Sequence, residues 1–309
     1  MNGSTNISFP IFLTANILSI VILSHGNCGP SRCIACYLVS MAAADLLVLI
    51  FEVIMHVLKE IYFPKSFLDY TSICCLTFTF TFISIDFSVW LTVAFSFDRS
   101  VSICCQKLRV KYCTEKTATV VIAIVCGLSA VQNMPSYFVN QPGNLIDNMA
   151  WIYVVKSDFY ILPVWKAYLC LDTILTPFAV FFFISVFNAL TIQHIVMSSR
   201  VRRNFREGIK DSEFENRRKS IILLLSISGS FICLWMLISI CHACVQFTEN
   251  QFYQTNNNDP FTIVEHTGYM LQLLSSCTNT FIYAVAQTKF RNEVKNMITC
   301  QYSQRIQKC

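Results

Sequence analysis

The sequence predicts an all-α membrane protein: a seven-transmembrane helix bundle with a short amphipathic helix 8. Of its 309 residues, 54% are hydrophobic and only 13% are charged, against roughly 45–50% and about 25% in ordinary soluble domains. Several runs without any charge are longer than the roughly 20 residues that a helix needs to cross a bilayer. Basic residues gather in alternate connections between those runs. This composition excludes a soluble enzyme and a disordered chain.

Seven apolar stretches account for the bundle, which we expect to be a single domain over residues 1–309. Five of them lie in runs without charged residues: 1–31, 117–146, 173–199, 220–248 and 266–288. Two more are interrupted by isolated acids, which is typical of spans that face a polar interior. The spans are expected at 7–24, 33–58, 72–104, 117–137, 164–199, 215–245 and 263–286, with helix 8 at 288–298.

The basic residues predict the orientation. The segments that follow the first, third, fifth and seventh spans hold 18 of the 23 Lys and Arg residues. By the positive-inside rule, the N-terminus is extracellular and the C-terminus cytoplasmic, in a multi-pass protein of the plasma membrane. Asn2 and Asn6 then become glycosylation acceptors on the outer side. The net charge of +5 suits the anionic lipids of the inner leaflet, and a nucleic acid is not expected as a partner.

The 16 cysteines do not predict a secreted disulfide framework, because most fall on the cytoplasmic side or inside spans. Two Cys-x-x-Cys units close together in the chain, of the kind that bind zinc, do not occur in the sequence, so packing is the expected role for most thiols. Cys300 lies shortly after the last span and is a candidate for palmitoylation.

Asp45 lies in the middle of the second span, where a carboxylate is costly unless it is hydrated, paired or bound to a cation. Other spans carry oxygens that could join it around a sodium ion: Asn16, Ser88, Ser275, Ser276 and Asn279. The sequence leaves a sodium site and a simple polar network both open. Apart from this allosteric ion, we expect no cofactor.

A set of polar residues in the outer halves of the spans predicts a ligand-binding site: Glu52, His56, Asp86, Asp172, His242, Glu265, Tyr269 and Gln272. Within it, Glu52 and His56 share a helix face, as do Glu265 and Tyr269. Ionisable groups inside a membrane usually serve function, and several acids near aromatic residues favour an amine-bearing small molecule. Asp86 is the strongest candidate, whereas Asp172 and His242 are equally well explained as structural groups.

Asp98 and Arg99 form an acid–base step at the cytoplasmic end of the third span. A charge pair in a partly desolvated place breaks only when another partner compensates, and a peptide helix from a cytoplasmic protein could do so. The step is therefore a candidate switch. The alternative is an interfacial pair whose charged ends simply reach water.

These features together resemble the rhodopsin-like (class A) G protein-coupled receptors over essentially the whole chain. The residues that carry the resemblance are Ala15-Asn16, Ala44-Asp45, Asp98-Arg99, Pro177, Phe231, Trp235 and Asn279-Thr280-Phe281-Ile282-Tyr283. The resemblance implies a small-molecule or peptide ligand and a heterotrimeric G protein as partners. It also implies an activation switch made of Asp98, Arg99, Pro177, Phe231, Trp235, Asn279 and Tyr283.

More narrowly, the chain resembles the orphan branch around G-protein coupled receptor 139. Asn16-Ile17-Leu18, the run at 42–49 and Lys289-Phe290-Arg291 carry this likeness. It implies a ligand similar to an aromatic amino acid.

The chain departs from the family pattern at four switch positions. Thr280 replaces a proline, Ser100 an aromatic residue, Ser185 a tyrosine and Leu237 a proline. Cys74 fits the family's outer disulfide, but the outer loop at 138–163 has no cysteine, which leaves its partner open.

Other substitutions narrow the class. Thr81 stands in place of the amine-binding Asp of monoamine receptors, and Leu273 in place of the retinal-binding Lys of opsins. Hydrolase, Walker and His-rich metal motifs do not occur, so we expect no enzyme.

Three functions remain open. The first is a ligand-activated receptor that activates a G protein. The second is a non-signalling or decayed receptor paralogue, which the altered switch positions suggest. The third is a small transporter or channel, which would predict repeats and broken spans that the sequence does not show.

Overall fold

The computed structural model describes most of the chain. The described residues are 5–25, 31–58, 62, 66–146, 149–159, 161–205, 212–248, 260–286 and 290–296. Two predicted modification sites, Asn2 and Cys300, lie outside them. Asn6 and His56 fall within helices whose side chains are not described at those positions.

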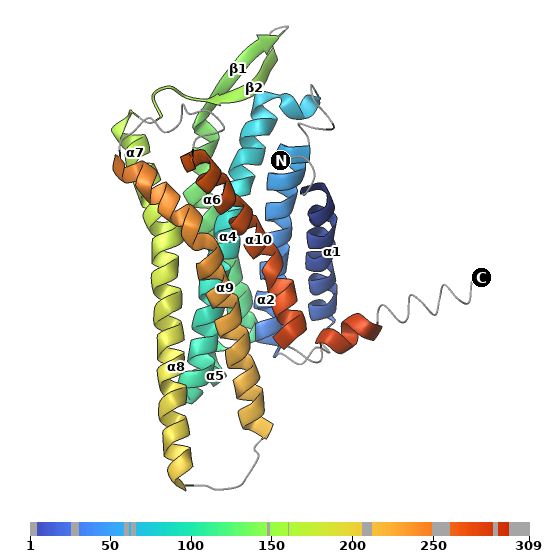
Figure 1. Ribbon diagram of the computed structural model, residues 1–309, viewed down its shortest axis with the longest axis vertical. Coiled ribbons are helices and arrows are strands. Elements are labelled where there is room, and N and C mark those ends of the chain that lie inside the picture. Colours follow the sequence, from blue (N-terminus) through green and yellow to red (C-terminus); the bar gives the residue numbers. More distant parts are fainter. Residues whose placement is uncertain are drawn as a thin grey trace, which may run out of the picture.

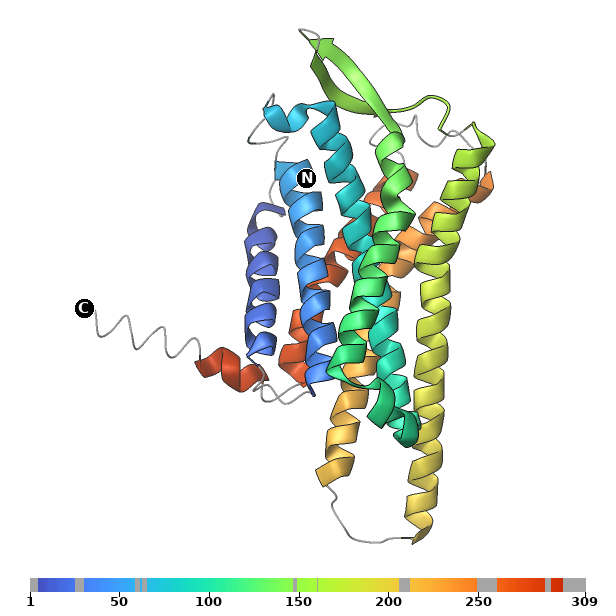
Figure 2. The same cartoon turned by 180° about the vertical axis from the view of Figure 1, so that it is seen from behind.

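The described chain forms a bundle of long helices that lie side by side along the longest axis (Figures 1 and 2). The long elements are α1 (Thr5–Ser24), α2 (Arg32–Val48) with the π-helix η1 (Leu49–Leu58), α4 (Thr71–Cys104), α6 (Glu115–Asn133), α7 (Pro163–Thr173) with the π-helix η4 (Ile174–Ala179) and α8 (Val180–Phe205), α9 (Ser212–Thr248) and α10 (Pro260–Ala286). The all-α membrane fold predicted from the sequence is confirmed.

Five helical segments in the described part are long and apolar enough to cross a membrane: Arg32–Val53, Thr71–Cys104, Glu115–Phe138, Pro163–Ser198 and Ile221–Val245. The described apolar stretch of α1, Pro10–Ser24, is shorter. α10 has the length of a span, with 27 residues, but it carries many hydroxyl and amide side chains. Four of them, Gln272, Ser275, Ser276 and Asn279, line the cavity described below.

Short elements mark the two ends of the bundle. At one end, Cys105 separates α4 from α5 (Gln106–Tyr112), and a helix at 290–296 follows α10 (Figure 1). Phe290 of that helix is buried, with its ring centroid 6.2 Å from that of Tyr283. We call this the α5 end. The short helices η2 (Phe67–Asp69) and η3 (Met134–Phe138) lie toward the opposite end.

The opposite end, which we call the hairpin end, carries an antiparallel β-hairpin of β1 (Asn140–Ile146) and β2 (Met149–Val155). Figures 1 and 2 show it projecting beyond the helices. The sequence predicted only a loop here. The aromatic and β-branched residues of β2 are typical of strands, so the signal was present but confined to seven residues.

The hairpin is anchored on the start of α4. The Thr71 hydroxyl donates to the Ile152 carbonyl at 2.5 Å, and the Tyr70 and Trp151 rings are 5.0 Å apart. Ile152 has φ of 57°, a conformation that is costly for a β-branched residue. The contacts around Ile152 therefore have to offset local backbone strain.

Pro177 explains the π-helix η4. Proline has no N–H to donate and its ring clashes with the preceding turn, so a regular α-helical ladder cannot run through it. The wider π turn absorbs the break, and α7, η4 and α8 continue as one rod.

Two apolar clusters hold the bundle together. Leu38, Met41, Leu91, Phe95 and Leu224 belong to a cluster that joins α2, α4 and α9. A second cluster joins α4, α8 and α9 around Val89, Ile184 and Trp235.

α9 and α10 approach closely at a glycine. A Cβ atom added at Gly268 would lie 3.1 Å from the backbone of Ile238, so α9 would have to move by a few tenths of an ångström to accommodate a larger residue.

Candidate functional site

Asp45 is the centre of a polar site inside the bundle. Its side chain is buried, and each carboxylate oxygen accepts one hydrogen bond. Ser88 Oγ of α4 donates to Oδ1 at 2.5 Å, and Asn279 Nδ2 of α10 donates to Oδ2 at 2.9 Å. Hydrogen bonds thus join three of the six residues that the sequence assigned to a sodium site: Asp45, Ser88 and Asn279.

A small cavity lies beside this carboxylate. It offers about 10 Å³ to the centre of a water-sized particle, which is room for roughly one water molecule. Its wall includes the predicted sodium-site residues Asp45, Ser88, Ser275, Ser276 and Asn279. Hydroxyl, amide and carboxylate oxygens are the ligands that a hard cation prefers, so the donor set fits a sodium ion.

Asn16 lies at the edge of this site, on α1. Its Nδ2 donates to the Ser276 carbonyl at 3.0 Å, which joins α1 to α10. Its Oδ1 is buried and has no hydrogen-bond partner among the described residues. A buried amide oxygen without a partner is costly, but Asn16 is not among the residues that line the Asp45 cavity, so the structure does not place this oxygen in the predicted sodium site.

Aromatic residues of α9 close the cavity toward the hairpin end. Trp235 and Phe231 line it, and their ring centroids are 5.2 Å apart. Phe231 also contacts Phe181 of α8, with centroids 6.0 Å apart. Phe181 follows Pro177 by four residues, so three predicted switch residues lie along one path from η4 to the Asp45 cavity.

Thr280 explains one departure from the family pattern. Ser19 Oγ donates to its hydroxyl at 2.9 Å, and the Thr280 hydroxyl is 3.3 Å from the Ala15 carbonyl. Where a proline would remove a backbone donor from α10, threonine keeps the helix continuous and binds it to α1.

Tyr283 is completely buried one turn after Asn279. Within the described part of the chain, its hydroxyl has no hydrogen-bond partner. Such a group gains a hydrogen bond only if the surrounding helices rearrange or water enters, which is consistent with its predicted place in a switch.

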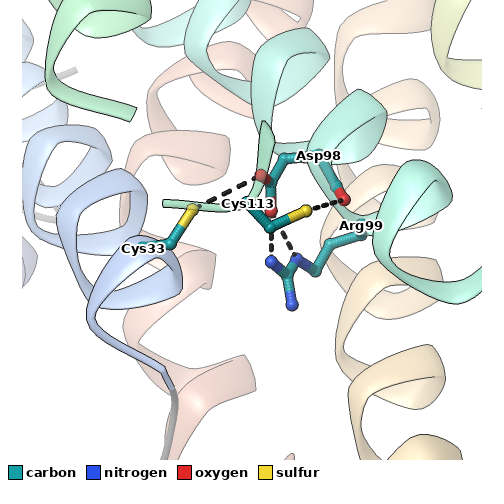
Figure 3. Close-up of polar contacts among 4 residues, drawn as sticks. All are labelled: Cys33, Asp98, Arg99 and Cys113. Carbon is teal, nitrogen blue, oxygen red and sulfur yellow. Dashed lines mark hydrogen bonds and ion pairs between the residues drawn. The ribbon is translucent and has the colours of Figure 1, made fainter. Parts of the chain in front are cut away.

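The acid–base step at the α5 end is a buried charge pair (Figure 3). Arg99 donates to Asp98 Oδ2 through Nε, at 3.1 Å, and through a second guanidinium nitrogen. Asp98 and Arg99 are 6% and 4% exposed, so the alternative of an interfacial pair reaching water does not describe this arrangement. The Arg99 guanidinium also lies 6.0 Å from the Phe95 ring centroid.

Two cysteine thiols donate hydrogen bonds to Asp98, and neither was predicted from the sequence. Cys33 Sγ of α2 donates to Asp98 Oδ1 at 3.4 Å, and Cys113 Sγ donates to the Asp98 backbone carbonyl at 3.7 Å (Figure 3). Cys113 follows α5, outside the spans. Burial and the nearby Asp98 carboxylate raise the pKa of its thiol to about 11, so it remains a donor at neutral pH. A thiol gives no strong sequence signal for this role.

Asp86 and Asp172 belong to a second polar network, which joins α4, α6, α7 and η4. Asp86 accepts from Asn133 Nδ2 at 2.6 Å and from Thr176 Oγ1 at 3.0 Å. Gln132 Nε2 lies 3.3 Å from both Asp172 Oδ1 and Thr176 Oγ1. The acids were predicted, whereas their partners were not, although two adjacent amides in an otherwise apolar span are a usable signal.

The other predicted ligand-binding residues lie on three further elements, α9, α10 and η1. His242 and Tyr269 face each other between α9 and α10, with ring centroids 6.0 Å apart and Nε2 3.4 Å from the hydroxyl. Glu265 precedes Tyr269 by one turn, and Gln272 lines the Asp45 cavity. Glu52 is half-buried in η1, the element that also contains His56. The eight predicted ligand-binding residues therefore lie in three places: the network of Asp86 and Asp172, the facing sides of α9 and α10, and η1.

Cys74 is buried near the hairpin end, and its Sγ donates to the Leu68 carbonyl at 3.2 Å. Among the described contacts, those of Tyr70, Thr71 and Trp151 join the hairpin to the start of α4.

Comparison with known proteins agrees with this arrangement. Residues 15–283 match the family described as 7 transmembrane receptor (rhodopsin family). The match runs from α1 to Tyr283 and so includes the Asp45 site, the Asp98–Arg99 pair and the aromatic residues of α9. The family consists of signalling receptors and not of enzymes. The chain therefore belongs to the rhodopsin family of seven-transmembrane receptors, and it is a multi-pass membrane protein.

Proposed function

We propose that the chain is a G protein-coupled receptor of the plasma membrane. In this proposal a small extracellular ligand binds in the half of the bundle near the hairpin end, and a heterotrimeric G protein binds at the α5 end. The distribution of basic residues supports this orientation.

One observation carries the proposal. Trp235 and Asp45 line the same cavity, which lies between the candidate ligand residues and the buried Asp98–Arg99 pair. A shift of α9 at Trp235 therefore changes the packing around Asp45 directly, which offers a physical route between the two ends.

The buried charge pair defines the closed arrangement. With Arg99 bound to Asp98, its guanidinium is not available to a partner. A ligand that binds better to an arrangement with separated inner helix ends shifts the population toward it, and Arg99 can then bind a peptide helix of the G protein. Exposed Lys107, Arg109 and Lys111 on α5 favour acidic elements of that partner.

For the ligand, we propose an amine-bearing compound, with an aromatic amino acid as the leading example. The Asp86 network, the His242–Tyr269 pair and Glu265 supply acids and hydrogen-bond partners. The resemblance to the branch around G-protein coupled receptor 139 supports the same class. A peptide ligand is the alternative that the test below includes.

For the ion, we propose that sodium binds next to Asp45, with Ser88, Ser275, Ser276 and Asn279 around it. A bound cation would supply positive charge that compensates the buried carboxylate. The residues of the chain would position its oxygens and, through Asn279, hold α10 against α2. Glycans on Asn2 and Asn6 and an acyl group on Cys300 are further proposals of the same topology.

The experiment is to express the chain in cells and to record calcium, cyclic AMP and G protein dissociation against amino acids, amines and peptides. We expect a ligand-dependent response that is lost in Arg99→Ala at normal surface expression. Arg32→Ala is the matched control, because Arg32 is an exposed arginine at the same end.

Two other outcomes of this experiment would indicate a different function. Ligand-dependent uptake or current without G protein involvement would indicate a transporter or channel. A chain that reaches the surface and never activates a G protein would indicate a non-signalling paralogue. That second candidate is favoured by Ser185, which is exposed on α8 where the family has a tyrosine.

A further inference from the structure

A groove runs along the outside of the bundle between α4 and α8, near the α5 end. It has a volume of about 490 Å³, within the range of roughly 300–1,000 Å³ typical of small-molecule sites. Phe97 and Val101 of α4 and Phe187, Leu190 and Met197 of α8 form its apolar wall.

The groove faces hydrocarbon. Both α4 and the segment that includes α8 are long and apolar enough to cross a membrane, so the outer side of their contact lies against lipid. Phe97, Leu190 and Met197 are each about half exposed, at 48%, 49% and 60%. The volume and the mainly apolar lining suit an acyl chain, and Ser100, Gln193 and His194 add polar groups to the lining.

Positive charge lies directly at one end of this groove. Cys104 and Cys105 line it, and α5 begins at the next residue. Lys107, Arg109 and Lys111 are exposed on α5, and this helix contains no acidic residue. Both views of the molecule show α5 beside the lower part of α8 (Figures 1 and 2).

We propose that the groove binds one acyl chain of an anionic phospholipid, whose headgroup lies against the basic residues of α5. An apolar groove in a span that ends at a cluster of three cations matches a lipid with a negative headgroup better than a neutral one. The orientation proposed above decides only which leaflet supplies the lipid. Lipid binding itself depends on neither orientation nor G protein activation.

A second occupant has to be distinguished. Cys105 is exposed at the end of the groove, so an acyl chain could also reach the groove from a thioester on its sulfur. A thioester adds mass that persists through unfolding and is removed by hydroxylamine, whereas a bound phospholipid is lost on unfolding.

The test is native mass spectrometry of the full chain, purified in detergent and mixed with phosphatidylserine or with phosphatidylcholine of the same acyl chains. We expect phosphatidylserine to be retained at least about fivefold more. Replacing Lys107, Arg109 and Lys111 together by Gln should remove this preference. The matched control replaces Lys116, Lys156 and Lys166 by Gln, which removes the same charge elsewhere and should leave the preference intact.

The groove itself is tested by Leu190→Trp, which fills it with a larger side chain. We expect this variant to retain less phosphatidylserine, while Leu128→Trp, at an exposed leucine on α6, retains it normally. Equal retention of the two lipids, or retention unchanged in the α5 triple variant, would overturn the proposal. So would a hydroxylamine-sensitive acyl mass that disappears in Cys105→Ser. Since no signalling is measured, failure here leaves the proposed receptor function standing.

Discussion

Asp45 and Asn279 are 234 positions apart in the sequence, yet Asn279 Nδ2 donates to Asp45 Oδ2 at 2.9 Å. This bond joins α2 to α10 in the middle of the bundle. Ser88 occupies the other carboxylate oxygen from α4, so the acid is shared by three helices. A change in the charge of Asp45 is therefore expected to alter the contacts among all three helices.

Sodium should stabilise the receptor through Asp45. At a free sodium concentration tenfold above the dissociation constant, the gain is about 1.4 kcal/mol. A thermal unfolding assay in sodium chloride and in choline chloride at equal ionic strength measures it. Asp45→Asn should abolish the difference, because the amide keeps the shape of the side chain and removes its charge. An equal effect of sodium on both proteins would contradict the proposed site.

Asp98→Asn should raise G protein activation in the absence of ligand. The substitution weakens the hold on Arg99, and a loss of about 1.4 kcal/mol from the closed arrangement alone raises a small open population about tenfold. The measurement is ligand-free G protein dissociation at matched surface expression. Asp158→Asn, at an exposed acid near the hairpin end, is the control. Basal activity unchanged or lowered by Asp98→Asn would speak against the switch.

The Asp86 network should contribute measurably to stability. Removing Asp86 takes away the acceptor of Thr176 and one of the two acceptors of Asn133, which costs about 1–3 kcal/mol. A double-mutant cycle of Asp86→Ala and Asn133→Ala should give a coupling of about 0.5–3 kcal/mol in thermal or chemical unfolding. Additive effects of the two variants would show that the 2.6 Å hydrogen bond between Asn133 and Asp86 contributes no coupling energy.

Once a ligand is known, variants can distinguish a ligand-binding role of Asp86 from a purely structural one. If Asp86 also binds the amine, Asp86→Asn should weaken the ligand by about 1–3 kcal/mol, the range for a lost charge-assisted hydrogen bond. Asn133→Ala should then leave affinity nearly unchanged, because it removes only the structural partner. Equal ligand affinity in wild type and Asp86→Asn would restrict Asp86 to stability.

The hairpin should depend on Trp151 for its attachment to the bundle. The Trp151 ring packs against Tyr70, and the neighbouring Ile152 carbonyl accepts from the Thr71 hydroxyl at the start of α4. Trp151→Ala should therefore increase the rate at which a protease cuts the hairpin, with Val154→Ala, at a half-exposed position of the same strand, as the control. Equal cutting rates in the two variants would contradict this anchoring role.

The spans were predictable because charge is so costly in hydrocarbon that its scarcity outlines each helix. Asp45, Ser88 and Asn279 were predictable as a group for the same reason: polar residues in apolar spans have to find one another. Gln132 and Asn133 were missed because uncharged amides do not interrupt an apolar run. Pro177 accounts for the π-helix η4. The π-helix η1 contains no proline, so the sequence offered no reason to expect η1.

The close approach of Gly268 to Ile238 brings α10 against α9 toward the hairpin end. From Ile238, α9 continues without a proline to Ser212, about 39 Å away at 1.5 Å per residue. A rotation of α9 by about 10° around Ile238 would move Ser212 by about 7 Å. Because Leu237 stands in place of the family's proline, α9 is unbroken next to this contact, and such a rotation would be carried along the whole helix.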